Sequence, residues 1–391
     1  MILLDAPYVS DFLKLSVKAL KLPVLDTPSA RSMTDGADVV FIDTDEFTRR
    51  LASGERVYTN SENSLDLIIK AAGDSDLARQ IEICKDKALF RETIADIHPD
   101  YQFLRATPDS LKDLDISHMP CPFVAKPARG FFSLGVHLVS SHDQWPETIT
   151  AILAEQTAMN DEYPEEVVDG GEFIIEQGIA GEEYAIDVYY NGAGEPVITN
   201  ILHHHFISED DVSDRFYYTS PEIIRTWLEP FTDYVTRIGR VCEFRNFPIH
   251  LEVRVDAAGH IVPIEANPLR FAGWCVADIT THAWGFNPYE YYFKDMRPDW
   301  TAILKERGEE ACGMIIGDVP AGIDRDTISH IDFDSFLGLF ETVLELRKID
   351  YTAYPLFAFV FAKMESGSMD AIRPLLEADF SRYISMNPTT G

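Results

Sequence analysis

The sequence predicts a mixed protein, α/β at its start and α+β further along. Residues 1–85 alternate short apolar runs, at 2–4 and 39–42, with helical patterns, which is typical of a βαβ layer. Further along, two alternating apolar runs each turn back around a short polar segment, which predicts antiparallel hairpins. The chain has 391 residues, 46% of them hydrophobic, so it can bury the cores of two to three domains.

The first 85 residues supply the elements of the βαβ layer. Ser10 or Asp11 can cap the first helix, in which Leu13, Val17 and Leu20 recur at helical spacing. No GxGxxG motif follows the first apolar run. That absence argues against an ordinary dinucleotide site at this position.

From residue 86 the pattern predicts a helix at 86–97, a strand at 122–128, a glycine-containing turn at 129–139 and a strand at 172–178. A hairpin is expected over 183–202, turning at 191–195, and a second over 248–268, turning at 256–259. The apolar stretch 353–362 is too short to span a bilayer and is expected to be a buried strand.

Charge and cysteine content exclude some classes of function and partner. The 33 basic and 65 acidic residues give a formal net charge of −32, which repels nucleic acids and anionic lipid surfaces. We therefore expect neither a nucleic-acid partner nor a membrane partner. The five cysteines are scattered and form no CxxC pair, which favours a reduced, cytoplasmic setting. Asp5 interrupts the first apolar run, so the start of the chain does not resemble a signal peptide.

The second hairpin carries the most informative acids. Cross-strand partners whose numbers sum to about 517 set Glu252 opposite Glu265, and Asn267 follows on the same face. Two carboxylates and an amide oxygen suit Mg²⁺, with Mn²⁺ as the alternative ion. The competing interpretation is a surface hairpin with solvated acids.

Two further segments have the composition of a polyanion or nucleotide site. Lys126 ends a strand before a turn in which Gly130 and Gly135 flank Ser133, so backbone N–H groups could approach a phosphate. The alternative is an ordinary turn. Glu176 ends an apolar strand and Glu183 lies seven residues on, where an extended linker could meet a purine and a ribose. The alternative is a strand that ends in solvated acids.

The order of these motifs resembles the ATP-grasp superfamily of carboxylate–amine ligases. The resemblance rests on Lys126-Pro-x-x-Gly, then Glu176 to Glu183 with G-x-E, then Glu252, then Ile-Glu265-x-Asn267, and covers about residues 1–300. It implies an ATP-grasp fold with an N-terminal Rossmann-like domain at 1–85. The grasp domain would span 86–300 with a lid at about 110–180, and residues 301–391 would form a C-terminal α/β extension.

The resemblance also implies roles for single residues. Lys126 would hold the α- and β-phosphates, the backbone at Ile179 would meet adenine beside Glu176 and Gln177, and Glu183 would hold the ribose. Either Arg91 or Lys87 would be the first basic ATP contact, and we prefer Arg91. The remaining implied contacts are Ser133 in the glycine turn, and the metal ligands Glu252, Glu265 and Asn267.

Two arginines compete for the acyl phosphate or the substrate carboxylate. Arg270 follows Asn267 by three residues, one more than in some relatives, and Arg254 completes an HxExR pattern similar to that of amino-acid ligases. One of them could instead pair with a carboxylate. Of the consecutive histidines 203–205, only two can share a strand face. We expect His203 or His205, preferably His205, to line the nucleotide cleft.

The implied reaction passes the γ-phosphoryl group of ATP to a carboxylate and lets an amine attack the acyl phosphate. Catalysis would rest on positioning and charge neutralisation by Mg²⁺, Lys126 and an arginine, because no Ser or Cys nucleophile constellation is present. The substrates would be a small carboxylate and an amine, one of them an amino acid or small peptide, and the resemblance leaves a homodimer open. Two alternatives are an ATP-grasp enzyme with a thiol or phosphoryl acceptor, and a nucleotide-binding regulator without turnover.

Overall fold

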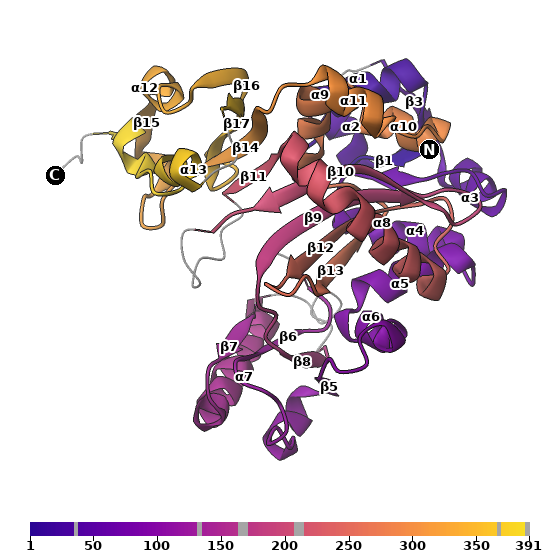
Figure 1. Cartoon of the computed structure of the whole chain (residues 1–391), viewed down its shortest axis with the longest axis vertical. Coiled ribbons are helices and arrows are strands. Elements are labelled where there is room, and N and C mark those ends of the chain that lie inside the picture. The colour runs from indigo at the N-terminus through magenta and orange to yellow at the C-terminus, as the bar shows by residue number, and fades with distance from the viewer. Residues whose placement is uncertain (35–37, 131–134, 163–170, 207–214, 366–368, 388–391) are drawn as a thin grey trace.

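The computed structural model describes residues 1–34, 38–130, 135–162, 171–206, 215–365 and 369–387. These residues form a parallel sheet at the N-terminus, a small unit with its own sheet, and one large antiparallel sheet (Figure 1). None of the helices in these ranges is long and apolar enough to cross a membrane. The five cysteines are free in the structure.

The N-terminal part is a parallel sheet of four short strands in the order β3-β2-β1-β4, as expected for a Rossmann-like layer. Ser10 caps the first helix through the backbone N–H of Leu13. The elements are β1 (Ile2–Leu3), α1 (Asp11–Leu20), β2 (Pro23–Leu25), α2 (Pro28–Thr34), β3 (Val40–Ile42), α3 (Thr44–Ala52), β4 (Tyr58–Thr59), the 3₁₀ turn η1 (Glu62–Ser64), α4 (Leu65–Ala72), α5 (Asp76–Lys85) and α6 (Lys87–Thr93).

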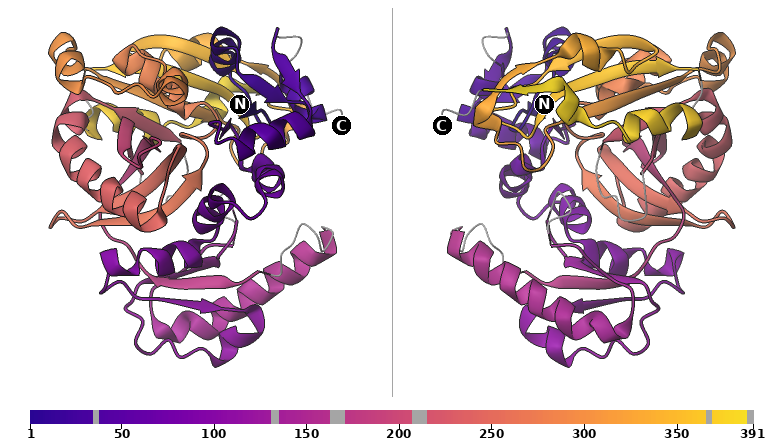
Figure 2. Two further views of the ribbon diagram at one scale, coloured as in Figure 1. Left: turned by 90° about the vertical axis from the view of Figure 1, so that its right-hand side faces the viewer. Right: turned by 90° about the vertical axis from the view of Figure 1, so that its left-hand side faces the viewer.

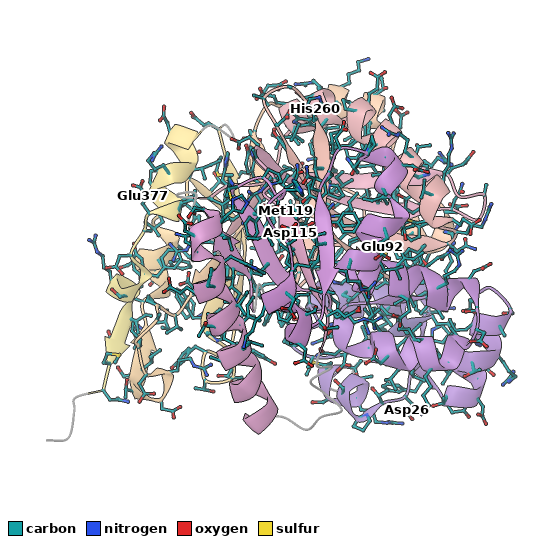
Figure 3. All side chains as sticks on the ribbon, turned by 90° about the horizontal axis from the view of Figure 1, so that it is seen from below. Asp26, Glu92, Asp115, Met119, His260 and Glu377 are labelled. Carbon is teal, nitrogen blue, oxygen red and sulfur yellow. The ribbon has the colours of Figure 1, made fainter. Side chains whose placement is uncertain are left out.

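A second unit, which we call the lid unit (residues 103–177), has its own four-stranded sheet in the order β5-β8-β6-β7. Its helix α7 packs Trp145, Ile149 and Ile152 onto Phe123 and Val139 in a separate hydrophobic core. Both views in Figure 2 place the lid unit below the rest of the molecule, and Figure 3 shows its side chains, with Asp115 and Met119 labelled, from below. Its elements are β5 (Phe103–Ala106), β6 (Phe123–Pro127), β7 (His137–Val139), α7 (Trp145–Glu162) and β8 (Phe173–Gln177).

The large sheet has eight antiparallel strands in the order β13-β12-β9-β10-β11-β14-β17-β16. Both predicted hairpins are confirmed, because β9 pairs with β10 around residues 191–195 and β12 pairs with β13 around 256–260. The strands are β9 (Glu182–Tyr190), β10 (Pro196–His204), β11 (Phe216–Thr219), β12 (Phe247–Val255), β13 (Ile261–Pro268), β14 (Ala311–Asp318), β16 (Thr342–Lys348) and β17 (Leu356–Met364).

The C-terminal part continues this sheet, because β14, β16 and β17 all lie after residue 300. Residues 353–362 contain most of β17, which is buried as predicted. The domain boundaries at 85 and 300 stay predictions. The remaining elements are α8 (Pro221–Cys242), α9 (Ile279–Trp284), α10 (Pro288–Lys294), α11 (Trp300–Glu306), β15 (Ile328–Ile331), α12 (Phe333–Leu337), α13 (Met369–Leu376) and β18 (Ile384–Met386).

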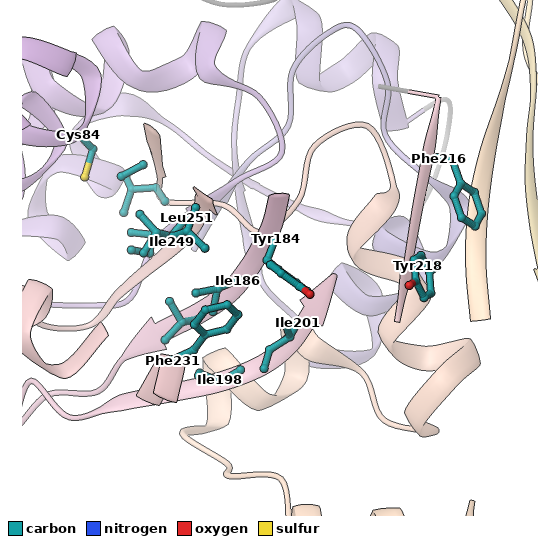
Figure 4. Packing of buried hydrophobic residues seen from close by; sticks show 14 of the residues in the cluster. Cys84, Tyr184, Ile186, Ile198, Ile201, Phe216, Tyr218, Phe231, Ile249 and Leu251 are labelled. Atoms are coloured by element: carbon teal, nitrogen blue, oxygen red, sulfur yellow. The ribbon is translucent and has the colours of Figure 1, made fainter. Parts of the chain in front are cut away.

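One face of the large sheet is covered by α8. The helix begins at Pro221 after the capping residue Ser220, and it buries Phe231 and Ile238 in the same core as Tyr184 and Ile186 of β9. Figure 4 shows this packing, with Phe231 beside Ile186 and Ile198. Because side chains alternate along a strand, the residues between these apolar ones point to the opposite face.

Candidate functional site

The opposite face of strands β9, β10, β12 and β13 carries a row of charged and polar side chains, which we call the polar face. Cross-strand pairing aligns Glu183 with Arg254 and His204, Asp187 with His250, and Glu252 with Glu265. Few of these side chains could be solvated freely, since Asp187 is fully buried and His250 is 4% exposed. The polar face therefore holds charges in a partly desolvated setting.

The carboxylate pair, Glu252 and Glu265, lies at the end of the polar face nearest the sheet edge. The two residues are direct cross-strand partners, as the sequence predicted, although a β-bulge between Glu252 and Val253 shifts the register by one residue nearer the turn. Asn267 lies on the same face, and its amide nitrogen donates to Glu265 Oε1 at 3.3 Å. The side chains of Glu252 and Glu265 are 22% and 27% exposed, so the pair is open to a ligand.

The carboxylate pair is electrostatically strained in this state. Burial and the neighbouring Glu265 both raise the pKa of Glu252. Burial also opposes ionisation of Glu265, but the charges of Lys87 and Lys126 outweigh it and lower the pKa of that carboxyl. Lys87 Nζ lies 3.1 Å from Glu265 Oε2 and also donates to the Gly130 carbonyl at 3.0 Å. Lys87 thus pairs directly with Glu265, one of the two adjacent carboxylates.

These properties fit a divalent cation. Two partly exposed carboxylates that repel one another, with an amide oxygen nearby, are the hard ligands that Mg²⁺ prefers. A bound cation would relieve the repulsion that raises the pKa of Glu252. Glu252, Glu265 and Asn267 are therefore the residues that would hold the metal.

A buried pair behind the carboxylates orients them. His250 Nδ1 lies 2.8 Å from Asp187 Oδ1, and His250 Nε2 lies 3.4 Å from Glu252 Oε1. Burial lowers the pKa of His250, but Asp187 and Glu252 outweigh it and raise the value to about 9. His250 is therefore a cation at neutral pH and holds Glu252. Asp187, a single acid within an apolar strand, was missed by the sequence analysis, although a lone buried charge is itself a signal.

A second charged group, which we call the cation cluster, lies between the lid unit and α6. Glu176 of β8 accepts from Lys126 Nζ and from Arg91 Nε, both at 2.7 Å, and from the Tyr101 hydroxyl at 3.1 Å. Burial would raise the pKa of Glu176, but Lys126 and Arg91 lower it to about 2. The carboxylate of Glu176 thus faces two cations, which it holds in position.

Arg91 has unused donors. It is 3% exposed, and its Nη1 and Nη2 atoms have no hydrogen-bond partner among the described residues. Its guanidinium lies 4.5 Å from the centre of the Tyr101 ring. Buried donors of a charged group are costly to leave unpaired, so this arrangement favours an anionic ligand. The structure places Arg91 at the cation cluster and Lys87 at the carboxylate pair.

The connection between the lid unit and β9 carries the predicted adenine and ribose residues. The Gln177 carbonyl accepts from the Tyr101 hydroxyl at 2.9 Å, and the Ile179 carbonyl accepts from Arg254 Nη1 at 3.0 Å. Arg254 Nε also donates to Glu183 at 3.1 Å. Arg254 is thus engaged with Glu183, the residue predicted to hold the ribose.

Arg270 lies at the other end, where it meets the N-terminal part of the chain. Its Nη2 donates to Glu62 Oε1 at 2.6 Å, and the Arg270 side chain is 13% exposed. Leu269 before it has a φ of +57°. Glu62 was missed by the sequence analysis, although it follows β4, and residues after the carboxyl ends of parallel strands commonly line ligand sites.

One predicted ligand contact, His205, does not lie on the polar face. The structure brings His204, and not His205, to the polar face, where His204 Nδ1 lies 2.9 Å from Glu183 Oε1. β10 ends at His204, and the ring of His205 lies beside that of His203, with 4.0 Å between the ring centres, on the other side of the sheet. Ser133 lies outside the described residues. Of the flanking glycines, Gly135 has a φ of +70°, a conformation that favours glycine.

Comparisons with known proteins identify the fold. Residues 119–278 match the family described as ATP-grasp domain. A search of curated proteins found no match. Among solved structures, the L-amino acid ligase from Bacillus licheniformis superposes with a TM-score of 0.68 and 17% identity, over 98% of this chain and 97% of that chain.

Two other solved structures are similar. N5-carboxyaminoimidazole ribonucleotide synthetase from Thermotoga maritima has a TM-score of 0.63 and 14% identity, over 99% of both chains. Biotin carboxylase from Campylobacter jejuni has a TM-score of 0.62 and 9% identity, over 99% of this chain and 92% of that chain. The structural similarity extends past residue 300, whereas the resemblance in sequence covered only about residues 1–300. The chain therefore has the ATP-grasp fold, and its residues 119–278 match the ATP-grasp domain family.

Proposed function

We propose that this protein is an ATP-dependent ligase that joins a carboxylate to an amine through an acyl phosphate. The observation that carries the proposal is the meeting of the carboxylate pair with the cation cluster. Lys126 links the two, because it contacts Glu176 and its charge also lowers the pKa of Glu265. One group suits a metal ion and the other suits phosphate, as Mg²⁺-ATP requires.

The nucleotide would lie between the lid unit and the polar face. Lys126 and Arg91 would bind phosphate oxygens, with Glu176 fixing both cations. Glu183 would accept from a ribose hydroxyl, and the backbone at Gln177 and Ile179 would meet the adenine edge. The unpaired Nη1 and Nη2 atoms of Arg91 support this assignment.

Glu252, Glu265 and Asn267 would hold Mg²⁺, which supplies charge neutralisation on the phosphate oxygens. His250 keeps Glu252 oriented, and Lys87 keeps positive charge at Glu265. Because the sequence contains no Ser or Cys nucleophile constellation, the substrate carboxylate itself would attack the γ-phosphorus and release ADP. The amine would then attack the acyl carbon and expel phosphate, with its proton passing to solvent.

We assign the substrate carboxylate to Arg270. A guanidinium can bind a carboxylate through two parallel hydrogen bonds, and Arg270 already binds the carboxylate of Glu62 at 2.6 Å. The HxExR pattern and the likeness to an L-amino acid ligase favour an amino acid or small peptide as one substrate. Closure of the lid unit would exclude water from the acyl phosphate.

Phosphate release tests this proposal. The full chain is incubated with ATP, Mg²⁺ and amino acids, singly and in pairs, and the products are weighed by mass spectrometry. The proposal expects phosphate together with the mass of a condensed pair. The Glu265→Gln variant should lose this turnover, whereas Glu309→Gln, which alters an exposed acid paired with Arg225 of α8, should retain it. Condensation that survives in Glu265→Gln, or phosphate without any condensed product across the panel, would contradict the proposal.

A further inference from the structure

Two of the three consecutive histidines at 203–205 do not face the proposed nucleotide site. On the other face of the sheet they form part of a set of side chains that can bind a metal ion. Among the described residues, Glu182, His203 and His205 each offer one ligand atom, and these three atoms lie within 4.8 Å of one another. The sequence analysis had only the two histidines, which share a face. The third ligand comes from the start of β9, 21 residues earlier than His203.

This set is separate from the carboxylate pair. His203 is the cross-strand partner of Tyr184, whose neighbour Glu183 points to the polar face. Tyr184 in turn packs on Trp227 of α8, with ring centres 5.2 Å apart. Glu182, His203 and His205 therefore lie on the α8 side of the sheet, and Figure 4 shows Tyr184 and Tyr218 on this side with Phe231 of α8.

The geometry around His203 matches that of a metal-bound histidine. Its Nε2 lies 3.1 Å from Glu182 Oε2, and its Nδ1 lies 3.0 Å from the Tyr218 hydroxyl. Metal-ligating histidines commonly use the second ring nitrogen in this way, because the outer hydrogen bond fixes the tautomer and the orientation of the ring. The same hydroxyl lies 3.3 Å from His205 Nε2, so one tyrosine orients both imidazoles.

The ring of His203 is also held in place by packing. It stacks on Tyr184 at 4.4 Å between ring centres and is 7% exposed, so little side-chain freedom would be lost on binding. The Glu182 side chain is 66% exposed and can move toward an ion. His203 keeps the pKa of Glu182 below its usual range, so the carboxylate is ionised at neutral pH.

We propose that Glu182, His203 and His205 bind a divalent transition-metal ion of the zinc type, at a site distinct from the Mg²⁺ site. Two imidazoles and one carboxylate suit Zn²⁺, Co²⁺ or Ni²⁺ better than Mg²⁺, which prefers oxygen. Zinc bonds of about 2.0–2.2 Å place tetrahedral ligand atoms roughly 3.4 Å apart. The 3.1 Å contact between His203 and Glu182 is close to that spacing, so only a small shift is needed to bring in His205. The ion would tie the start of β9 to the end of β10.

Cobalt binding tests the site, because Co²⁺ bound by imidazole absorbs visible light. The full chain, freed of any polyhistidine tag, is titrated with Co²⁺ in excess Mg²⁺, which occupies the oxygen ligands of the carboxylate pair. We expect one Co²⁺ per chain with a d–d absorption band, and displacement of it by Zn²⁺. Zn²⁺ should also raise the melting temperature of the protein.

Three variants locate the ion. Glu182→Gln and His205→Gln should weaken Co²⁺ binding by at least about 100-fold, and Tyr218→Phe, which removes only the orienting hydroxyl, by about 10-fold. His260→Gln, which alters an exposed histidine at the turn of the second hairpin, is the matched control and should bind Co²⁺ as the wild type does. Replacement of the buried His203 is avoided, because it could unfold the protein. Absence of Co²⁺ binding by the wild type, or unchanged binding in both Glu182→Gln and His205→Gln, would overturn the proposal.

Discussion

The carboxylate pair and the cation cluster are built from the same kinds of side chain with opposite charge balance. The pair and the buried groups behind it combine three acids, Glu252, Glu265 and Asp187, with two cations, Lys87 and His250, which leaves one negative charge in excess. The cation cluster combines Arg91 and Lys126 with the single acid Glu176, which leaves one positive charge in excess. A metal ion would therefore balance the negative charge of the carboxylate pair, and a polyphosphate would balance the positive charge of the cation cluster.

The two groups also differ in exposure. Glu252 and Glu265 keep 22% and 27% of their side-chain surface, whereas the Glu176 side chain keeps 3%. An exposed acid can exchange a lysine for a metal ion at little cost. A buried acid cannot lose its cations without a large penalty. The carboxylate pair is therefore suited to turnover, and Glu176 is suited to holding Arg91 and Lys126 in position.

The largest expected effect is on catalysis, at the carboxylate pair. Glu265→Gln should lower the rate of phosphate release by about 100-fold or more, because metal ions contribute several kcal/mol to the transition state. The protein should remain folded, as circular dichroism would verify. A rate within threefold of the wild type would remove Glu265 from the site.

The next effect is on stability, at the cation cluster. Glu176→Gln leaves Arg91 and Lys126 without their counter-charge, and we expect the free energy of unfolding to fall by about 3 kcal/mol. Denaturant unfolding measures this, with Glu309→Gln, a surface ion-pair partner, as the control that should show no resolvable change. Equal stability of Glu176→Gln and the wild type would mean that the cluster is not preorganised.

The buried His250 predicts a pH dependence. Its pKa is raised from 6.5 to about 9 in the folded protein, so its contribution is full below pH 6.5 and is lost as pH rises through 9. The difference in unfolding free energy between the wild type and His250→Gln should therefore shrink by roughly 3 kcal/mol over that window. His260→Gln, at an exposed histidine, gives the baseline. A pH-independent difference would show that His250 is not held as a cation.

The smallest effect distinguishes the two arginines. Arg254 bonds to Glu183 and to the Ile179 carbonyl, so Arg254→Met should raise the KM for ATP about 10-fold and leave the KM for the carboxylate substrate unchanged. Arg270→Met should raise the KM for the carboxylate substrate and leave the KM for ATP unchanged. Steady-state kinetics with each substrate varied in turn separates the two, and an exchange of these effects would reverse our assignment.

Much of the fold and part of the site follow from local sequence patterns. The opposition of Glu252 and Glu265 was predicted by counting the register from the turn. A β-bulge between Glu252 and Val253, which the sequence did not predict, shifts the pairing nearer the turn by one residue. The alternation of side chains along a strand also predicted that His203 and His204 point to opposite faces of the sheet. Which of these faces carries the proposed nucleotide site did not follow, because that depends on where α8 packs.

Contacts between distant segments were not predictable. Glu62 reaches Arg270 across 208 positions of the chain, and Arg91 reaches Glu176 across 85. No local pattern encodes such pairs. The joining of β14 to β11 likewise depends on tertiary packing, which is why the last ninety residues seemed separate in the sequence.

Calorimetric titration of ATP at several Mg²⁺ concentrations tests most directly the claim that the two groups bind one ligand, with metal and phosphate recognised separately. We predict that Mg²⁺ strengthens ATP binding to the wild type and that this dependence disappears in Glu265→Gln. In Lys126→Met, ATP binding should weaken at every Mg²⁺ concentration while its dependence on Mg²⁺ persists. An unchanged Mg²⁺ dependence in Glu265→Gln, or unchanged ATP affinity in Lys126→Met, would contradict the account.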